Sequence, residues 1–333
     1  MAIVGLLANP SSGKDVRRLV ARASVFDNQE KQAIVRRVIV GAMASGAKRF
    51  VYLDDPHGIV RNALAELGVP AEPVDATATG TALDTISAAR AMRKAEVEVV
   101  ITLGGDGTNR AFCLGWPDAV LLPVSTGTNN VFPVLVEATI AGAAAGLLAS
   151  GALVGEQLSN RQKLIQVQIE GERDDIALID AVLTRERFIG ARALLNPEYL
   201  AFAALTRADP AAVGITSIGG LLQPVSTTED IGLVIEFARD EPPAMTISAP
   251  LAPGYYRDLN VASFRTLNFD QPITLSGPGV LAFDGERERE LKPGQQATLR
   301  LNRNGPRVVD VNLTMRKAAH MGLYHRRPSK EKT

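Results

Sequence analysis

The strongest chemical signal in the chain is the segment Gly104-Gly105-Asp106-Gly107-Thr108, which follows an apolar run at residues 97–103. β-Branched and apolar residues that stop at two glycines are typical of a buried strand entering a tight loop. Glycine lets a ligand approach the backbone amides closely, and a helix would begin near Thr108. A carboxylate in such a loop can take the proton from a hydroxyl that attacks a phosphoryl group. We therefore predict Asp106 as the base of a phosphoryl transfer; the alternative is a residue that only caps the helix.

The loop at residues 9–14, Asn-Pro-Ser-Ser-Gly-Lys, follows a second apolar run at residues 3–8. Asn9, Ser12 and Lys14 could hold a triphosphate, although a lone lysine after glycine is equally well explained as an exposed charge. The spacing is not that of a nucleotide-binding P-loop, because Ala8 occupies the position of its first glycine.

A third polar loop, at residues 125–133, follows the apolar run at 119–124. Asn129 and Asn130 could bind the polar edges of ribose or adenine, or could simply occupy a turn that tolerates left-handed geometry. Gly104, Gly105, Gly107 and Thr108 would offer amides and a hydroxyl to phosphate oxygens. The sequence predicts that all three loops face one crevice, since ligands bind beyond the carboxyl ends of parallel strands.

These three motifs, in this order, resemble those of the NAD kinase and diacylglycerol kinase superfamily. The resemblance spans nearly the whole chain and is closest to the ATP-NAD kinase-like branch that includes the acetoin catabolism protein X. It implies an ATP-dependent kinase that uses ATP, NAD and Mg²⁺, places Asp106 at the reacting centre, and forms a homo-oligomer. It also implies that the nucleotide lies against Thr126, Gly127 and Thr128.

Two further acidic positions follow from the resemblance. Asp284-Gly285-Glu286 resembles the superfamily's acidic turn near the phosphates, although Asp-Gly is also a common hairpin signal. Asp180 stands where NAD kinases have an Asn-Glu pair that contacts the dinucleotide, and residues 216–220 match their Gly-Ser-Thr-Ala-Tyr stretch only in part. NAD stays the leading acceptor; a kinase of a small hydroxyl metabolite and a nucleotide-binding regulatory protein without turnover are the alternatives.

The elements that must position these residues alternate along the first half of the chain. Strands are predicted at residues 3–8, 49–53, 71–75, 97–103 and 119–124, with helices at 29–45, 58–67 and 81–94 between them. Such alternation favours a parallel sheet, here a Rossmann-like α/β domain over residues 1–150. On the helix at 29–45, the apolar stripe contains Ile34 and Val38, and Lys31 lies off it.

The second half changes pattern after Gly151. Residues 165–170 alternate strictly between apolar and polar, and several short segments separated by proline and glycine follow. We predict a β-rich, sandwich-like domain at residues 151–315 with a helical insertion at 199–205. A C-terminal tail follows at 316–333; a helix is predicted near 315–321, and the closing residues 326–333 are predicted to be solvated.

Composition limits the class of protein. A length of 333 residues favours two domains, and 36 Lys plus Arg against 36 Asp plus Glu argues against nucleic acid as a partner. No apolar run reaches 18 residues and the N-terminus carries no basic leader, so neither a membrane span nor a signal peptide is expected. Cys113 is the single cysteine, which fits buried packing in a reducing cytoplasm. His57, His320 and His325 are too scattered to predict a metal site.

Overall fold

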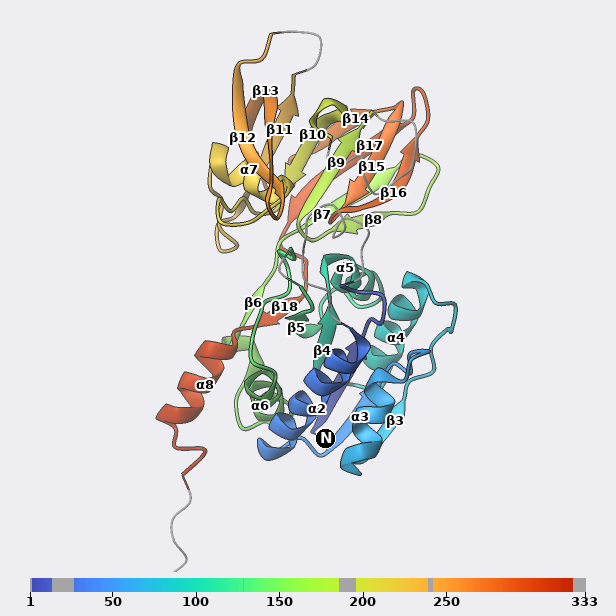
Figure 1. Ribbon diagram of the computed structural model, residues 1–333, viewed down its shortest axis with the longest axis vertical. Helices are drawn as coiled ribbons and strands as arrows, with labels where there is room; N and C mark the ends of the chain where they lie inside the picture. Colours follow the sequence, from blue (N-terminus) through green and yellow to red (C-terminus); the bar gives the residue numbers. More distant parts are fainter. Residues whose placement is uncertain (1, 14–26, 128, 186–195, 239–241, 326–333) are drawn as a thin grey trace, which may run out of the picture.

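The computed structural model describes residues 2–13, 27–127, 129–185, 196–238 and 242–325. Its first half alternates strands and helices as predicted (Figure 1). In chain order these elements are β1 (Ile3–Ala8), α2 (Asn28–Ala44), β2 (Arg49–Tyr52), α3 (Ile59–Leu67), β3 (Ala71–Pro73), α4 (Ala82–Lys94), β4 (Val99–Gly104), α5 (Asp106–Gly115), β5 (Val120–Ser125) and α6 (Ala138–Ala149).

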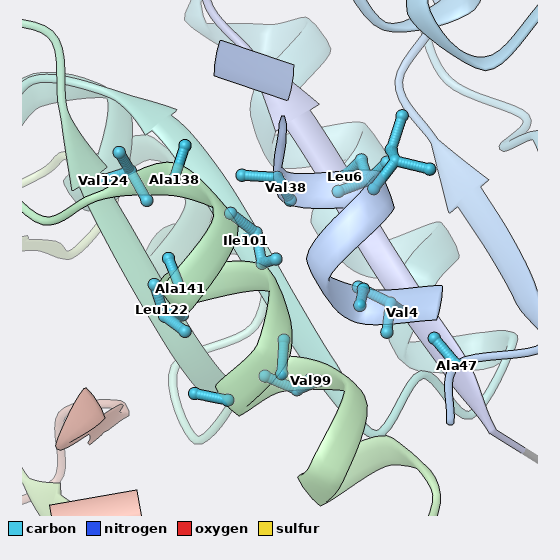
Figure 2. Close-up of a cluster of buried hydrophobic side chains, with 14 of the residues drawn as sticks. Val4, Leu6, Val38, Ala47, Val99, Ile101, Leu122, Val124, Ala138 and Ala141 are labelled. Atoms are coloured by element: carbon cyan, nitrogen blue, oxygen red, sulfur yellow. The ribbon is translucent and has the colours of Figure 1, made fainter. Parts of the chain in front are cut away.

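These strands form a parallel sheet in the order β3-β2-β1-β4-β5. One face packs against α2, α3 and α6, where Leu6, Val38, Ile101 and Ala141 meet (Figure 2). The other face packs against α4 and α5, and Cys113 is buried there. With both faces covered, the carboxyl ends of β1, β4 and β5 open toward the second half of the chain.

The second half consists of two packed antiparallel sheets. One has the order β12-β13-β11-β10-β9-β15-β16 and the other β14-β17-β7-β8. The elements are β7 (Leu164–Ile169), β8 (Asp175–Ala177), β9 (Asp180–Thr184), η3 (Pro197–Tyr199), β10 (Leu200–Leu205), α7 (Ile215–Leu222), β11 (Ile231–Phe237), β12 (Met245–Ala252), β13 (Tyr255–Asn268), β14 (Ile273–Ser276), β15 (Gly279–Phe283), β16 (Glu286–Leu291) and β17 (Gln296–Asn302).

The chain returns to the first sheet near its end. β18 (Arg307–Val309) pairs with β5 and with β6 (Ser159–Arg161), which follows η1 (Gly155–Gln157). The helix α8 (Val311–His320) then packs with the same helical layer through Ala318. The expected division at residue 150 therefore does not coincide with the division between sheets, because these short segments show no parallel-sheet pattern of their own.

The helical insertion predicted at residues 199–205 is wrong, since this stretch is mainly strand β10. Phe202 and Ala204 face the second sheet, whereas Ala203 and Leu205 face α7. Because both faces of β10 are buried, the strand shows no alternation that could reveal it from sequence. Within the described residues, no helix is both long and apolar enough to cross a lipid bilayer.

Candidate functional site

A cleft of about 320 Å³ lies between the α/β half and the β half. The three polar loops that follow β1, β4 and β5 form one wall, as their position after parallel strands predicted. The full lining consists of Asn9, Ser11, Ser12 and Gly13 with residues 105–108, 129–131, 179–180, 213–216, 251–253 and 284–286.

Asp106 joins the second and third of these loops. It is the first residue of α5, and the N-cap position before it belongs to Gly105. Its carboxylate accepts hydrogen bonds from the amide of Val131, at 3.1 Å to each oxygen, and from the amide of Phe132 at 2.7 Å. Because this carboxylate also lines the cleft, it is both held in place and presented to a ligand.

The first loop is bonded to the other two. The Asn9 side-chain amide donates to the Thr108 hydroxyl at 2.8 Å, and the Asn9 backbone amide donates to the carbonyl of Leu103. The hydroxyl of the buried Thr126 donates to Ser12 at 3.1 Å. These bonds make one polar surface from three loops that are far apart in the sequence.

Lys31 is fully buried, so its predicted place off the apolar face of α2 is wrong. Its ammonium group donates to the carbonyls of Asn9, Pro10 and Ser12 at 3.1, 2.9 and 2.6 Å. A buried lysine needs several such acceptors to replace its lost hydration. Lys31 thereby holds the first loop, a role that helical periodicity alone does not reveal.

Asp284 occupies the turn between β15 and β16, with φ of +50°, and is buried. Its carboxylate accepts from the amides of Leu178, Ile179 and Asp180 at 2.9, 2.7 and 3.2 Å. Burial raises its pKa to about 6 against the opposing effects of Arg110 and of the Leu178 and Ile179 amides. Asp284 thus ties the hairpin to the start of β9, where Asp180 meets the cleft.

The structure brings most of the predicted site residues together. Asn9, Ser12, Gly105, Asp106, Gly107, Thr108, Asn129, Asn130, Asp180 and Asp284 all line the cleft. Gly104, Thr126 and Gly127 belong to the same loops but lie outside this lining. Lys14 and Thr128 lie outside the described residues.

Sequence reasoning missed a second group of lining residues. Residues 213–216, at the start of α7, and residues 251–253, at the end of β12, form an uncharged wall. Glu286 lies directly over Gly107, so that a Cβ atom at this glycine would overlap the Glu286 carboxylate. The Asp-Gly-Glu turn was the one available signal for Glu286, and the partial match at residues 216–220 was the one signal for the wall, reaching only Thr216 of it.

The described lining carries four carboxylates, from Asp106, Asp180, Asp284 and Glu286, and no lysine or arginine. Among the residues with described positions, no group of three or more His, Cys, Asp and Glu side chains is arranged to hold a metal ion. Backbone amides and the N-terminus of α5 are therefore the groups that favour phosphate here. These carboxylates could complete the coordination of Mg²⁺ that arrives bound to a nucleotide. They do not form a site that would bind a metal ion through protein ligands alone.

Comparison with known proteins agrees with this architecture. Residues 4–152 match the ATP-NAD kinase N-terminal domain, and residues 163–304 match the acetoin catabolism protein X C-terminal domain. The chain is 37% identical to the acetoin catabolism protein X of Cupriavidus necator, over 97% of this chain and 93% of that protein. It is 32% identical over 133 residues to an uncharacterized protein of Archaeoglobus fulgidus, covering 40% of this chain and 36% of that protein.

A solved structure shares the fold. The crystal structure of yeast NADH kinase complexed with NADH superposes with a TM-score of 0.52 at 13% identity, covering 98% of this chain and 90% of the other. The shared fold is the NAD kinase-like pairing of an N-terminal α/β domain with a β-rich C-terminal domain.

Proposed function

This chain belongs to the family of the acetoin catabolism protein X, with an NAD kinase-like fold, and on that premise we propose that it is an ATP-dependent kinase. It transfers a phosphoryl group to a hydroxyl, with NAD as the leading acceptor. The observation that carries the proposal is Asp106, a carboxylate held by two backbone amides in the wall of a cleft formed by three strand-end loops.

Each part of the cleft has a role in this proposal. The amides of residues 105–108 and the N-terminus of α5 receive phosphate oxygens. Asn129 and Asn130 bind polar edges of the nucleotide. Asp106 accepts the proton of the attacking hydroxyl, which makes that oxygen a better nucleophile. When bound, Mg²⁺ would neutralise phosphate charge. Asp180 and Glu286 are the lining carboxylates that would hold it.

Two observations favour a second acceptor class. Ile179-Asp180 stands in place of the Asn-Glu pair that the resemblance leads one to expect for NAD, and the full-length relative is named for acetoin catabolism. A kinase of a small hydroxyl metabolite fits both. The same departure is compatible with a regulatory protein that binds NAD or ATP without turnover, although the retained Asp106 favours catalysis.

The experiment is a phosphoryl-transfer screen joined to a thermal-shift titration. ATP with Mg²⁺ is offered together with NAD, NADH, acetoin or small polyols, and phosphorylated product is measured. Either nucleotide at a hundredfold excess over its Kd should stabilise the fold by roughly 3 kcal/mol. A shift without any product would support the regulator. No shift with ATP or NAD at millimolar concentration would remove both the kinase and the regulator.

A further inference from the structure

Arg207 lies just beyond β10, on the β half of the molecule, and reaches the loop that holds Asp106. Its guanidinium donates to the side-chain oxygen of Gln162 at 3.0 Å and to the carbonyl of Val131 at 3.4 Å. It also lies over the Phe132 ring, 5.7 Å from the centroid. Nothing in the sequence pattern marks this residue.

The contact with Val131 is informative because of the peptide group it engages. The carbonyl that accepts from Arg207 and the amide of Phe132 that donates to Asp106 belong to the same peptide unit. A cation at the carbonyl end polarises the peptide and makes its N–H a stronger donor. The arginine therefore acts on the carboxylate through one rigid, planar group.

The charges around Arg207 agree with this placement. Burial lowers its pKa, while the negative charges of Asp106, Asp284 and Asp209 raise it. Within the described part of the chain, its buried Nε atom has no hydrogen-bond partner. An unsatisfied buried donor costs stability, so hydrogen bonding alone does not explain why Arg207 is buried. Its positive charge beside Asp106, Asp284 and Asp209 gives a second reason.

We propose that Arg207 is a positioning residue for the reaction: it orients the Val131–Phe132 peptide, and through it sets the direction of the Asp106 carboxylate in the cleft. The inference rests on the proposed function, in which Asp106 is the base. It also couples the β half to the catalytic loop of the α/β half, so that the base is correctly set only when the two halves are docked.

The test compares Arg207→Gln and Arg207→Lys with Arg303→Gln as a matched control. Arg303 likewise donates to backbone carbonyls and lies 5.7 Å from an aromatic ring, that of Phe269. Its carbonyl partners, on Arg161 and residues 227–229, lie outside the cleft lining, whereas the Arg207 partner Val131 belongs to it. We expect Arg207→Gln to lower kcat by about 10²-fold with KM for ATP nearly unchanged, because a displaced base affects the reaction more than binding. Arg207→Lys should recover part of kcat, and Arg303→Gln should lower Tm without changing kcat.

A second readout needs no turnover. Arg207→Gln is made in the wild type and in an Asp106→Asn background, and the loss in Tm is compared. Coupling through the shared peptide predicts a clearly smaller loss when Asp106 is already neutral. Equal losses in the two backgrounds, or wild-type kcat in a folded Arg207→Gln protein, would overturn the inference. An inactive wild type with retained coupling would instead reject the kinase proposal and keep the link between Arg207 and Asp106.

Discussion

At the scale of single residues, the two aspartates that precede a glycine in the cleft lining, Asp106 and Asp284, have different surroundings. Asp106 is partly exposed to the cleft and held by two amides, whereas Asp284 is buried and held by three. The first is available to a substrate proton. The second is largely committed to joining the β15–β16 turn to β9, and its raised pKa reflects burial.

The first prediction concerns Asp106→Asn, which keeps the shape of the side chain but cannot take a proton. If Asp106 is the base, kcat should fall by roughly 10²- to 10⁴-fold while nucleotide affinity stays near wild type or rises slightly. A role in holding metal would instead show partial recovery at high Mg²⁺. The control is Asp118→Asn, a half-exposed carboxylate outside the cleft, which should leave kcat unchanged. Wild-type turnover in a folded Asp106→Asn protein would rule out Asp106 as the base.

The second prediction follows from the pKa of Asp284, which is about 6 in the folded protein against an ordinary value of 3.8. The folded state binds this proton more tightly, so its contribution to stability is full below pH 3.8 and is lost as pH rises through 6. The total is about 3 kcal/mol. Relative to Asp284→Asn, which does not titrate, the wild type should lose roughly 2 kcal/mol between pH 4.5 and 7 in urea unfolding. A difference that does not vary with pH would contradict the assignment.

At the scale of elements, α2 and α6 pack with their backbones in close contact under the sheet. A Cβ atom on Gly41, Gly142 or Gly146 would overlap a backbone carbonyl of the opposite helix. The small residues of α6 thus serve helix packing, which explains why this apolar helix is rich in alanine and glycine. α2 begins after its N-cap Asp27, whose carboxylate accepts from the Glu30 amide, and this start places Lys31 below the first loop.

The third prediction concerns Gly142→Ala. In an open helix this change would add up to about 1 kcal/mol of stability. Here the new methyl group meets the carbonyl of Val38, so we expect a net loss of roughly 1–3 kcal/mol, measured by urea unfolding. Gly155→Ala is the matched control because its nearest neighbour would lie at 4.0 Å, and it should change stability by less than about 0.5 kcal/mol. A Gly142→Ala protein as stable as wild type would show that the helices can separate without cost.

At the scale of the whole molecule, a buried ion pair joins the two halves. Arg110 on α5 and Asp175 on β8 lie 2.6 Å apart, each only 4% exposed. The same guanidinium donates to the carbonyl of Ile176 and lies 5.0 Å from the Phe283 ring centroid. Arg289 adds a second, weaker contact to Asp175 at 3.3 Å. These side chains lie outside the cleft lining, and they join the half that carries α5 to the half that carries β8.

The fourth prediction is that Arg110→Met destabilises the protein by about 3–5 kcal/mol, because it leaves the Asp175 charge buried without its main partner. Adding Asp175→Asn should recover part of that loss. Fluorescence of the single tryptophan, Trp116 at the end of α5, and far-UV circular dichroism follow unfolding. The unfolding transitions detected by fluorescence and by circular dichroism should coincide in the wild type and separate in Arg110→Met. The exposed pair Arg93–Asp118, at 3.7 Å, is the control, and Arg93→Met should cost less than about 1 kcal/mol.

What the sequence determined by itself is local and periodic. Alternating strand and helix patterns predicted the parallel sheet, and the position of each glycine-rich loop after a strand predicted that Asn9, Asp106 and Asn130 would meet at one edge, as they do. Parallel strands leave few other arrangements, so the convergence of these loops needed no knowledge of distant contacts.

The tertiary structure alone decided which side chains control those loops. Lys31 is buried because the first loop folds over it, and Arg207 reaches Val131 because the segment that follows β10 lies against the third loop. The sequence predicts a helix where β10 lies and does not predict β18 in the first sheet, since neither strand carries its own periodic signal. The partners lie 19 to 22 residues away for Lys31 and 76 residues away for Arg207, beyond the range of helical or strand periodicity. A contact set by packing and desolvation leaves no trace in residue spacing.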